Sequence, residues 1–191
     1  MPYKITTAAT IKPVSLDEIK SHLNLEVDFT SDDELLEAMI DAAVDYAENF
    51  TRRALLTQTI EAKYDSFPNC FELERPPLAS VTSIQYIDTD GATQTLSASN
   101  YTVDTTSTPG RVVEAYGETW PSTRDIINAV TVTYVAGDTS AENVPNQIKQ
   151  AIKILVGDWY KDRESYIVAV SNVNELPHTA KILLRPYQVF L

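Results

Sequence analysis

The sequence predicts an α+β protein in which helices from both ends of the chain form a bundle, with an antiparallel β domain inserted between them. Three observations support this prediction. Apolar residues recur at three- and four-residue spacing near both ends of the chain. The period changes to two from about Leu56. Turn dipeptides such as Asp90-Gly91 and Pro109-Gly110 then separate the alternating segments.

Two helix starts are expected near the beginning of the chain. Ser15 and Glu18 have the spacing of a capping box, in which each side chain bonds the backbone amide of the other residue. Ser31 and Glu34 repeat this spacing. A long amphipathic helix should follow, and the residues expected on its apolar face are Leu35, Leu36, Met39, Ile40, Ala43, Tyr46, Ala47 and Phe50.

The alternating pattern in the middle of the chain predicts six or seven short strands, a number typical of an antiparallel sandwich or a small barrel. The segments that alternate are 58–64, 70–73, 81–87, 93–96, 101–103, 110–114 and 129–135. No strand is expected before them.

The helical period returns after Val144-Pro145, with a broad apolar face from Ile148 to Tyr160. A short helix is expected over 176–184. The predicted domains are therefore a helical core of residues 1–55 and 140–185, an inserted β domain of residues 56–139, and an apolar C-terminal tail of residues 186–191 that contacts a partner.

Charge and composition restrict the possible partners. The net charge is −12, with 27 acidic residues against 15 basic ones, which disfavours direct binding of nucleic acid. A single cysteine, Cys70, excludes an internal disulfide framework and favours a reducing compartment. No apolar run approaches the roughly 18 residues that a membrane span needs. We expect a protein made in the cytoplasm, with no membrane partner.

The sequence offers little for catalysis. Neither His22 nor His178 lies near a recognisable nucleophile motif, and five glycines leave no phosphate-binding loop. The run from Asp88 to Gly91 resembles the start of a calcium loop, but its glycine comes two positions too early, so a hairpin turn explains it better. We expect no catalytic, metal or cofactor site.

Aromatic residues of the β block leave one alternative open. Trp120 is expected to pack into the domain, but a carbohydrate-binding module could use Tyr101, Tyr116 and Trp120 as a ligand platform. Exposure of these rings around a pocket would favour that alternative.

The ordered set of features resembles the head–tail connector (adaptor or head-completion) proteins of long-tailed bacteriophages and related gene transfer agents. The similarity covers nearly the whole chain and suggests the longer branch of that family, which has an inserted β domain. The segments that carry it are 13–23, 32–43, 51–55, 75–91, 109–113, 144–152 and 183–187, with Tyr46, Tyr116-Gly117, Trp120-Pro121, Trp159-Tyr160 and Arg163-Glu164.

The resemblance implies a structural virion protein of the neck, without a catalytic site. About twelve copies would form a ring under the portal, extend the DNA channel and provide a platform for stopper or tail-terminator proteins. DNA would pass through without specific binding. Another neck or tail-completion protein remains an alternative.

Two groups of residues are candidates for these roles. The first is a partner or ring interface of Trp159, Tyr160, Arg163, Arg185, Tyr187, Val189, Phe190 and Leu191. A tail this apolar would be costly in water, although it could instead fold back on its own helices. The second is an acidic stripe that could be plain surface or could line the channel and repel DNA, formed by Glu37, Asp41, Asp45 and Glu48.

Overall fold

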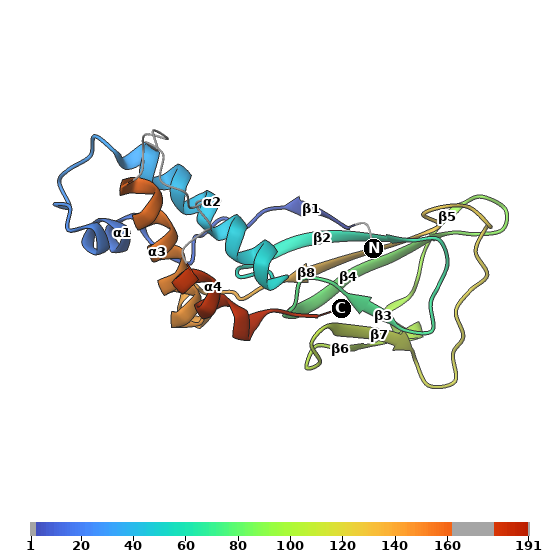
Figure 1. Ribbon diagram of the computed structural model, residues 1–191. Helices are drawn as coiled ribbons and strands as arrows, with labels where there is room; N and C mark the ends of the chain where they lie inside the picture. Colours follow the sequence, from blue (N-terminus) through green and yellow to red (C-terminus); the bar gives the residue numbers. More distant parts are fainter. Residues whose placement is uncertain (1–2, 162–177, 191) are drawn as a thin grey trace, which may run out of the picture. The chain divides into compact units, whose positions relative to one another are not determined.

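The computed structural model describes residues 3–161 and 178–190, which divide into two compact units (Figure 1). The β unit contains residues 3–10 and 52–139, and the helical unit contains the described residues of 11–51 and 140–190. The described residues form helices and two antiparallel sheets, so the predicted α+β class is confirmed.

The β unit has two separate sheets. The larger has the strand order β1-β2-β8-β4-β5 and the smaller the order β3-β7-β6, with every pairing antiparallel. Both sheets are open, with unpaired edge strands, so the described strands do not form a closed barrel. The strands are β1 (Tyr3–Thr7), β2 (Gln58–Tyr64), β3 (Phe71–Leu73), β4 (Leu78–Ile87), β5 (Thr93–Thr95), β6 (Tyr101–Asp104), β7 (Gly110–Glu114) and β8 (Val130–Ala136), with a 3₁₀ turn η1 (Ala98–Asn100) before β6.

Both sheets contribute to one hydrophobic core. Burial alternates along β2 and β8, as the period of two predicts, because successive side chains point to opposite faces of a sheet. Phe71 and Val112 of the smaller sheet lie in the same core cluster as Tyr134 of the larger one. The Tyr134 side chain is fully buried, and its hydroxyl donates a hydrogen bond to the carbonyl oxygen of Glu74 at 2.9 Å.

Strand β1 is a difference from the sequence prediction, which has no strand before residue 58. It pairs with β2 at the edge of the larger sheet, with Ile5 opposite Ile60. Most of β1 is exposed, so it lacks the alternation that reveals the other strands. Tyr3 is anchored by Arg75, whose Nε donates to the tyrosine hydroxyl at 2.8 Å.

The helical unit contains the predicted helices. Their bounds are α1 (Leu16–Leu23), α2 (Asp33–Thr51), α3 (Asn146–Lys161) and α4 (His178–Leu184), with 3₁₀ turns η2 (Ala141–Asn143) and η3 (Arg185–Tyr187). The predicted capping box of α1 is formed: the Ser15 amide donates to Glu18 at 2.9 Å, and the Glu18 amide donates to the Ser15 hydroxyl at 3.2 Å. The bond from Ser15 is the main cause that lowers the pKa of Glu18, with Lys153 contributing.

The second predicted capping box is wrong in its position. Helix α2 begins at Asp33, so Asp32 and not Ser31 directly precedes it. The Asp32 carboxylate accepts a hydrogen bond of 2.6 Å from the hydroxyl of Tyr160 on α3. Contact with a distant helix therefore fixes this region, and local spacing alone could not indicate it.

Helix α3 packs against the other three helices of its unit. This explains the broad apolar face that the sequence predicts, because such a face is covered by several neighbours. Leu35 is an exception among the predicted core positions, being 39% exposed. The buried apolar residues of the helical unit are Val14, Ile19, Leu36, Ile40, Ala43, Ala47, Val144, Ile148, Ala151, Ile152, Leu155, Val156, Ala180, Leu184 and Val189.

Candidate assembly surfaces

The candidate interface residues on α3 and after α4 differ in their environments. Trp159 is half-buried, and Tyr160 is half-buried with its hydroxyl bonded to Asp32. Arg185 is exposed and Tyr187 is half-buried. Two further candidates, Arg163 and Leu191, lie outside the described residues.

Two adjacent apolar residues of the C-terminal tail differ in burial. Val189 is only 6% exposed, and its amide donates a 2.9 Å hydrogen bond to the carbonyl oxygen of Thr51 at the end of α2. Phe190 is 80% exposed. The tail therefore folds back on its own helical unit at Val189 and presents Phe190 to solvent, and the predicted partner contact of the tail stays a prediction.

The acidic stripe on α2 is shorter than predicted. Glu37, Asp41 and Asp45 are exposed, but Glu48 is only 8% exposed and is not part of the solvated stripe. Lys12 partly balances the charge, since its Nζ lies 2.6 Å from Asp41. The Glu48 carbonyl oxygen accepts a 3.5 Å hydrogen bond from the Thr51 hydroxyl in the last turn of α2.

The loop between α1 and α2 is a surface that the sequence analysis missed. Lys20 is 2% exposed, and its Nζ lies 2.6 Å from Asp33 and donates to the carbonyl oxygen of Val27 at 3.1 Å. Around this buried ammonium group the loop presents Val27 (63% exposed) and Phe29 (38%) to solvent. In the sequence, the only indication of this surface is the mixture of acidic and apolar residues over 26–35.

Trp120 packs into the β unit, as predicted. Its ring stacks on Phe67 with centroids 5.0 Å apart and meets the edge of Phe71 at 5.6 Å. Tyr101 also packs against the core, whereas Tyr116 is fully exposed. The three rings of the carbohydrate alternative therefore do not share one exposed platform.

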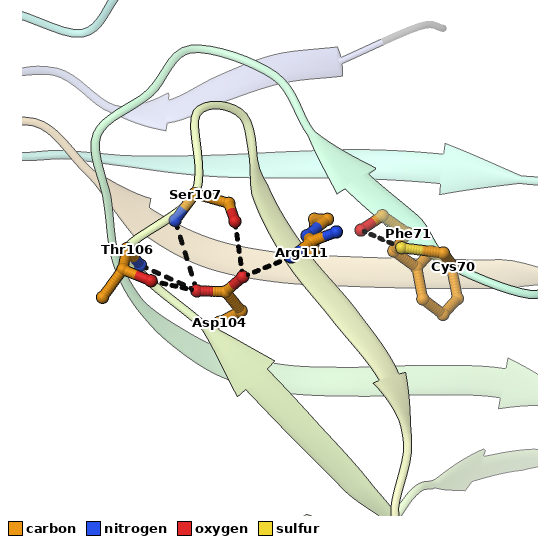
Figure 2. A network of polar contacts seen from close by, with 6 residues as sticks. All are labelled: Cys70, Phe71, Asp104, Thr106, Ser107 and Arg111. Atoms are coloured by element: carbon orange, nitrogen blue, oxygen red, sulfur yellow. Dashed lines mark hydrogen bonds and ion pairs between the residues drawn. The ribbon is translucent and has the colours of Figure 1, made fainter.

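A network of polar contacts closes the β6–β7 hairpin (Figure 2). The Asp104 carboxylate accepts hydrogen bonds from the side chains of Thr106 and Ser107, each at 2.6 Å, and from Arg111 at 2.8 Å. These bonds, with Ser107 first, hold the pKa of Asp104 far below its usual value. The nearby Cys70 thiol contacts the carbonyl oxygen of Phe71 at 3.7 Å. The network joins neighbouring residues of one turn, which gives it a structural role.

This network predicts an acid-dependent contribution to stability. A carboxyl whose pKa is depressed on folding stabilises the protein above its unfolded pKa, and this stabilisation is lost as the pH falls through the folded value. Asp104→Asn should therefore lower the urea midpoint at pH 7, and the difference from wild type should be smaller at pH 3, below the ordinary carboxyl pKa of 3.8. Asp90→Asn, in an exposed hairpin turn, is the control. An equal difference at both pH values would contradict the prediction.

The described part of the chain contains no group of three or more His, Cys, Asp or Glu side chains arranged to hold a metal ion. Among the described helices, none has the length and apolar character required to cross a membrane.

Comparison with solved structures finds the same fold over the whole chain. The protein is similar to a chain in the neck of an empty gene transfer agent (GTA) particle computed with C6 symmetry, with 20% identity and a TM-score of 0.79. It is also similar to a chain of a native GTA virion, with 21% identity and a TM-score of 0.78. A third similar chain comes from a native GTA neck computed with C12 symmetry, with 20% identity and a TM-score of 0.74. Each match covers 100% of this chain and 97% of the other. The search of curated proteins gives no match.

A family-level match agrees with this fold. The sequence profile described as "Phage gp6-like head-tail connector protein" matches residues 13–129, which include α1, α2 and β2 to β7. The match spans more than half of the chain and covers both structural units. The chain therefore belongs to the family of phage gp6-like head-tail connector proteins.

Proposed function

We propose that this head–tail connector protein forms a ring of about twelve copies in the neck of a phage or phage-like particle, under the portal. The observation that carries the proposal is the family match over residues 13–129. Support also comes from the fold likeness over the whole chain to neck chains whose structures have C6 and C12 symmetry. The family is one of structural neck proteins and is not a class of enzymes.

In this proposal the ring has three kinds of partner. Copies of the chain contact each other around the circle, the portal contacts one side, and a stopper or tail-terminator protein contacts the other. Packaged DNA passes through the centre without specific binding. The net charge of −12 agrees with this role, since a DNA-gripping surface would need an excess of Lys and Arg.

The acidic stripe is proposed to line the channel. Glu37, Asp41 and Asp45 are exposed on one side of α2, and repeating them around a ring would give a negative lumen. Like charges would then keep the DNA backbone from adhering to the wall, an effect that salt screens over about 10 Å. A ring structure in which these carboxylates point outward would refute the proposal.

The exposed end of the tail is proposed to contact the portal. Phe190 is held in place because the preceding residue, Val189, is bonded to Thr51. An apolar ring that is 80% exposed is costly in water, and a fixed aromatic side chain is a common anchor of protein interfaces.

Imaging of portal-containing particles made with and without this chain tests the proposed position. The expected result is a collar of added density directly below the portal when the chain is present. Density farther down the tail would favour the alternative of another neck or tail-completion protein. Particles that are complete and unchanged without the chain would overturn the proposal.

A further inference from the structure

The α1–α2 loop presents an apolar surface surrounded by acids. We define the loop surface as Val27 and Phe29 of the loop together with Leu35 in the first turn of α2, which are 63%, 38% and 39% exposed. Residues 26–35 carry five carboxylates and no lysine or arginine. Three large apolar side chains are thus exposed within nine residues, and exposed apolar side chains of this kind are suited to burial against a partner.

This loop has a fixed shape. The buried Lys20 ammonium joins the carbonyl oxygen of Val27 to the carboxylate of Asp33. Asn24 ends α1 in the left-handed conformation, and the Leu25 amide donates to the Lys20 carbonyl oxygen at 2.9 Å. A surface held in this way loses little conformational entropy on binding, which favours association.

A second surface with the opposite charge lies on α4 and at Arg185, the residue that follows it. His178, Ile182 and Arg185 follow each other at helical spacing, all three are exposed, and Ile182 is 56% exposed. We define these residues as the α4 surface. Residues 178–190 carry two basic residues, Lys181 and Arg185, and no carboxylate. The α4 surface therefore combines the apolar Ile182 with the positive charge of Arg185, which complements the apolar and acidic loop surface.

The two surfaces lie toward opposite ends of the helical unit. The loop surface is at the start of α2, where Asp33 binds Lys20, whereas the segment after α4 is bonded to Thr51 at the end of α2. The 19 residues of α2 span about 28 Å. Figure 1 shows α4 displaced from the α1–α2 loop toward the far end of α2. The surfaces therefore cannot cover each other within one copy.

We infer that the loop surface of one copy packs on the α4 surface of the next copy around the ring. Two different surfaces of each chain meet in such a heterologous contact, and a chain of these contacts closes into a ring when the rotation between copies allows it. Opposite charge at the rim selects the partner surface, and the apolar centre supplies the burial. This inference rests on the proposed ring and names the contact that closes it.

Paired cysteines test the contact in the full-length chain. Val27→Cys and Ile182→Cys are combined in a Cys70→Ser background, assembled into portal-containing particles and oxidised. A heterologous contact links each copy to the next, so a non-reducing gel should show a ladder of dimers, trimers and larger species. An isologous contact would stop at dimers. Val27→Cys with Gln150→Cys, an exposed position on α3, is the matched control and should remain monomeric.

A second pair, Phe29→Cys with Arg185→Cys, tests the same contact independently, in case one substitution of the first pair disturbs the structure locally. A ladder from either pair, absent from the control, supports the inference. A visible collar without a ladder from either pair would overturn the inference while leaving the proposed function intact. Ladders of equal strength in the control would also overturn it. The absence of any collar, with wild-type chain as well, would overturn the proposed function and this contact with it.

Discussion

Replacing Phe190 by aspartate is expected to prevent the chain from joining portal-containing particles while the isolated protein stays folded. Phe190 is 80% exposed, so removing its aromatic side chain should cost the isolated protein little stability. A buried aromatic anchor at an interface typically contributes 2–4 kcal/mol, roughly a 30- to 1,000-fold change in affinity. A charge at this site would add the cost of desolvation. Co-sedimentation with portal particles measures the binding, and circular dichroism measures the fold.

A point substitution separates binding from folding better than removal of residues 186–191. Truncation would also remove Val189, which is buried and bonded to Thr51, so it should destabilise the helical unit by itself. Ile127→Asp is the matched control, because Ile127 is 79% exposed in the β unit and has no role in the proposed portal contact. Phe190→Asp protein that enters particles at the wild-type level would refute the tail proposal.

Periodicity revealed most of the fold because most elements bury one face. The strands β2 and β8 lie inside the larger sheet, and their alternation follows directly from the pleat. The helix start at Ser15 depends on residues three positions apart, so local sequence contains the whole signal. Such features can be predicted without knowledge of tertiary contacts.

Features set by distant contacts were not predictable in the same way. Strand β1 is exposed at a sheet edge, and only its pairing with β2 defines it. The start of α2 is shifted to Asp33 in a region where Asp32 binds Tyr160, a residue 128 positions away. Side chains on an exposed face carry little periodic signal, and long-range hydrogen bonds carry none.

The candidate surfaces illustrate the same limit. The tail is largely apolar in sequence, yet Val189 is buried and the adjacent Phe190 is exposed. Glu48 is spaced like its exposed acidic neighbours but is covered at the end of α2. Lys20 is a polar helix residue by sequence, yet it is the buried centre of the α1–α2 loop. Exposure of individual side chains, on which an assembly surface depends, follows from packing.

Gly137→Ala is expected to have the largest effect on stability. Gly137 has a φ of +96°, where an L-amino acid is strained, and an added Cβ would overlap the backbone carbonyl of Leu56. Backbone atoms there cannot move away easily, since the Thr57 amide and the Asp138 carbonyl oxygen are bonded at 2.9 Å. Strain and overpacking each typically cost 1–3 kcal/mol, so we expect a loss of about 3–5 kcal/mol.

Gly117→Ala separates the two causes of this loss. Gly117 has a similar φ of +83°, but no atom lies within 4 Å of the position of its Cβ. Only the backbone strain remains, so the expected loss is about 1–2 kcal/mol. Urea unfolding followed by the fluorescence of Trp120, in a Trp159→Phe background, reports on the β unit that contains both glycines. If both variants lost equal stability, close contact with Leu56 would not be the cause, because Gly117 has no such neighbour.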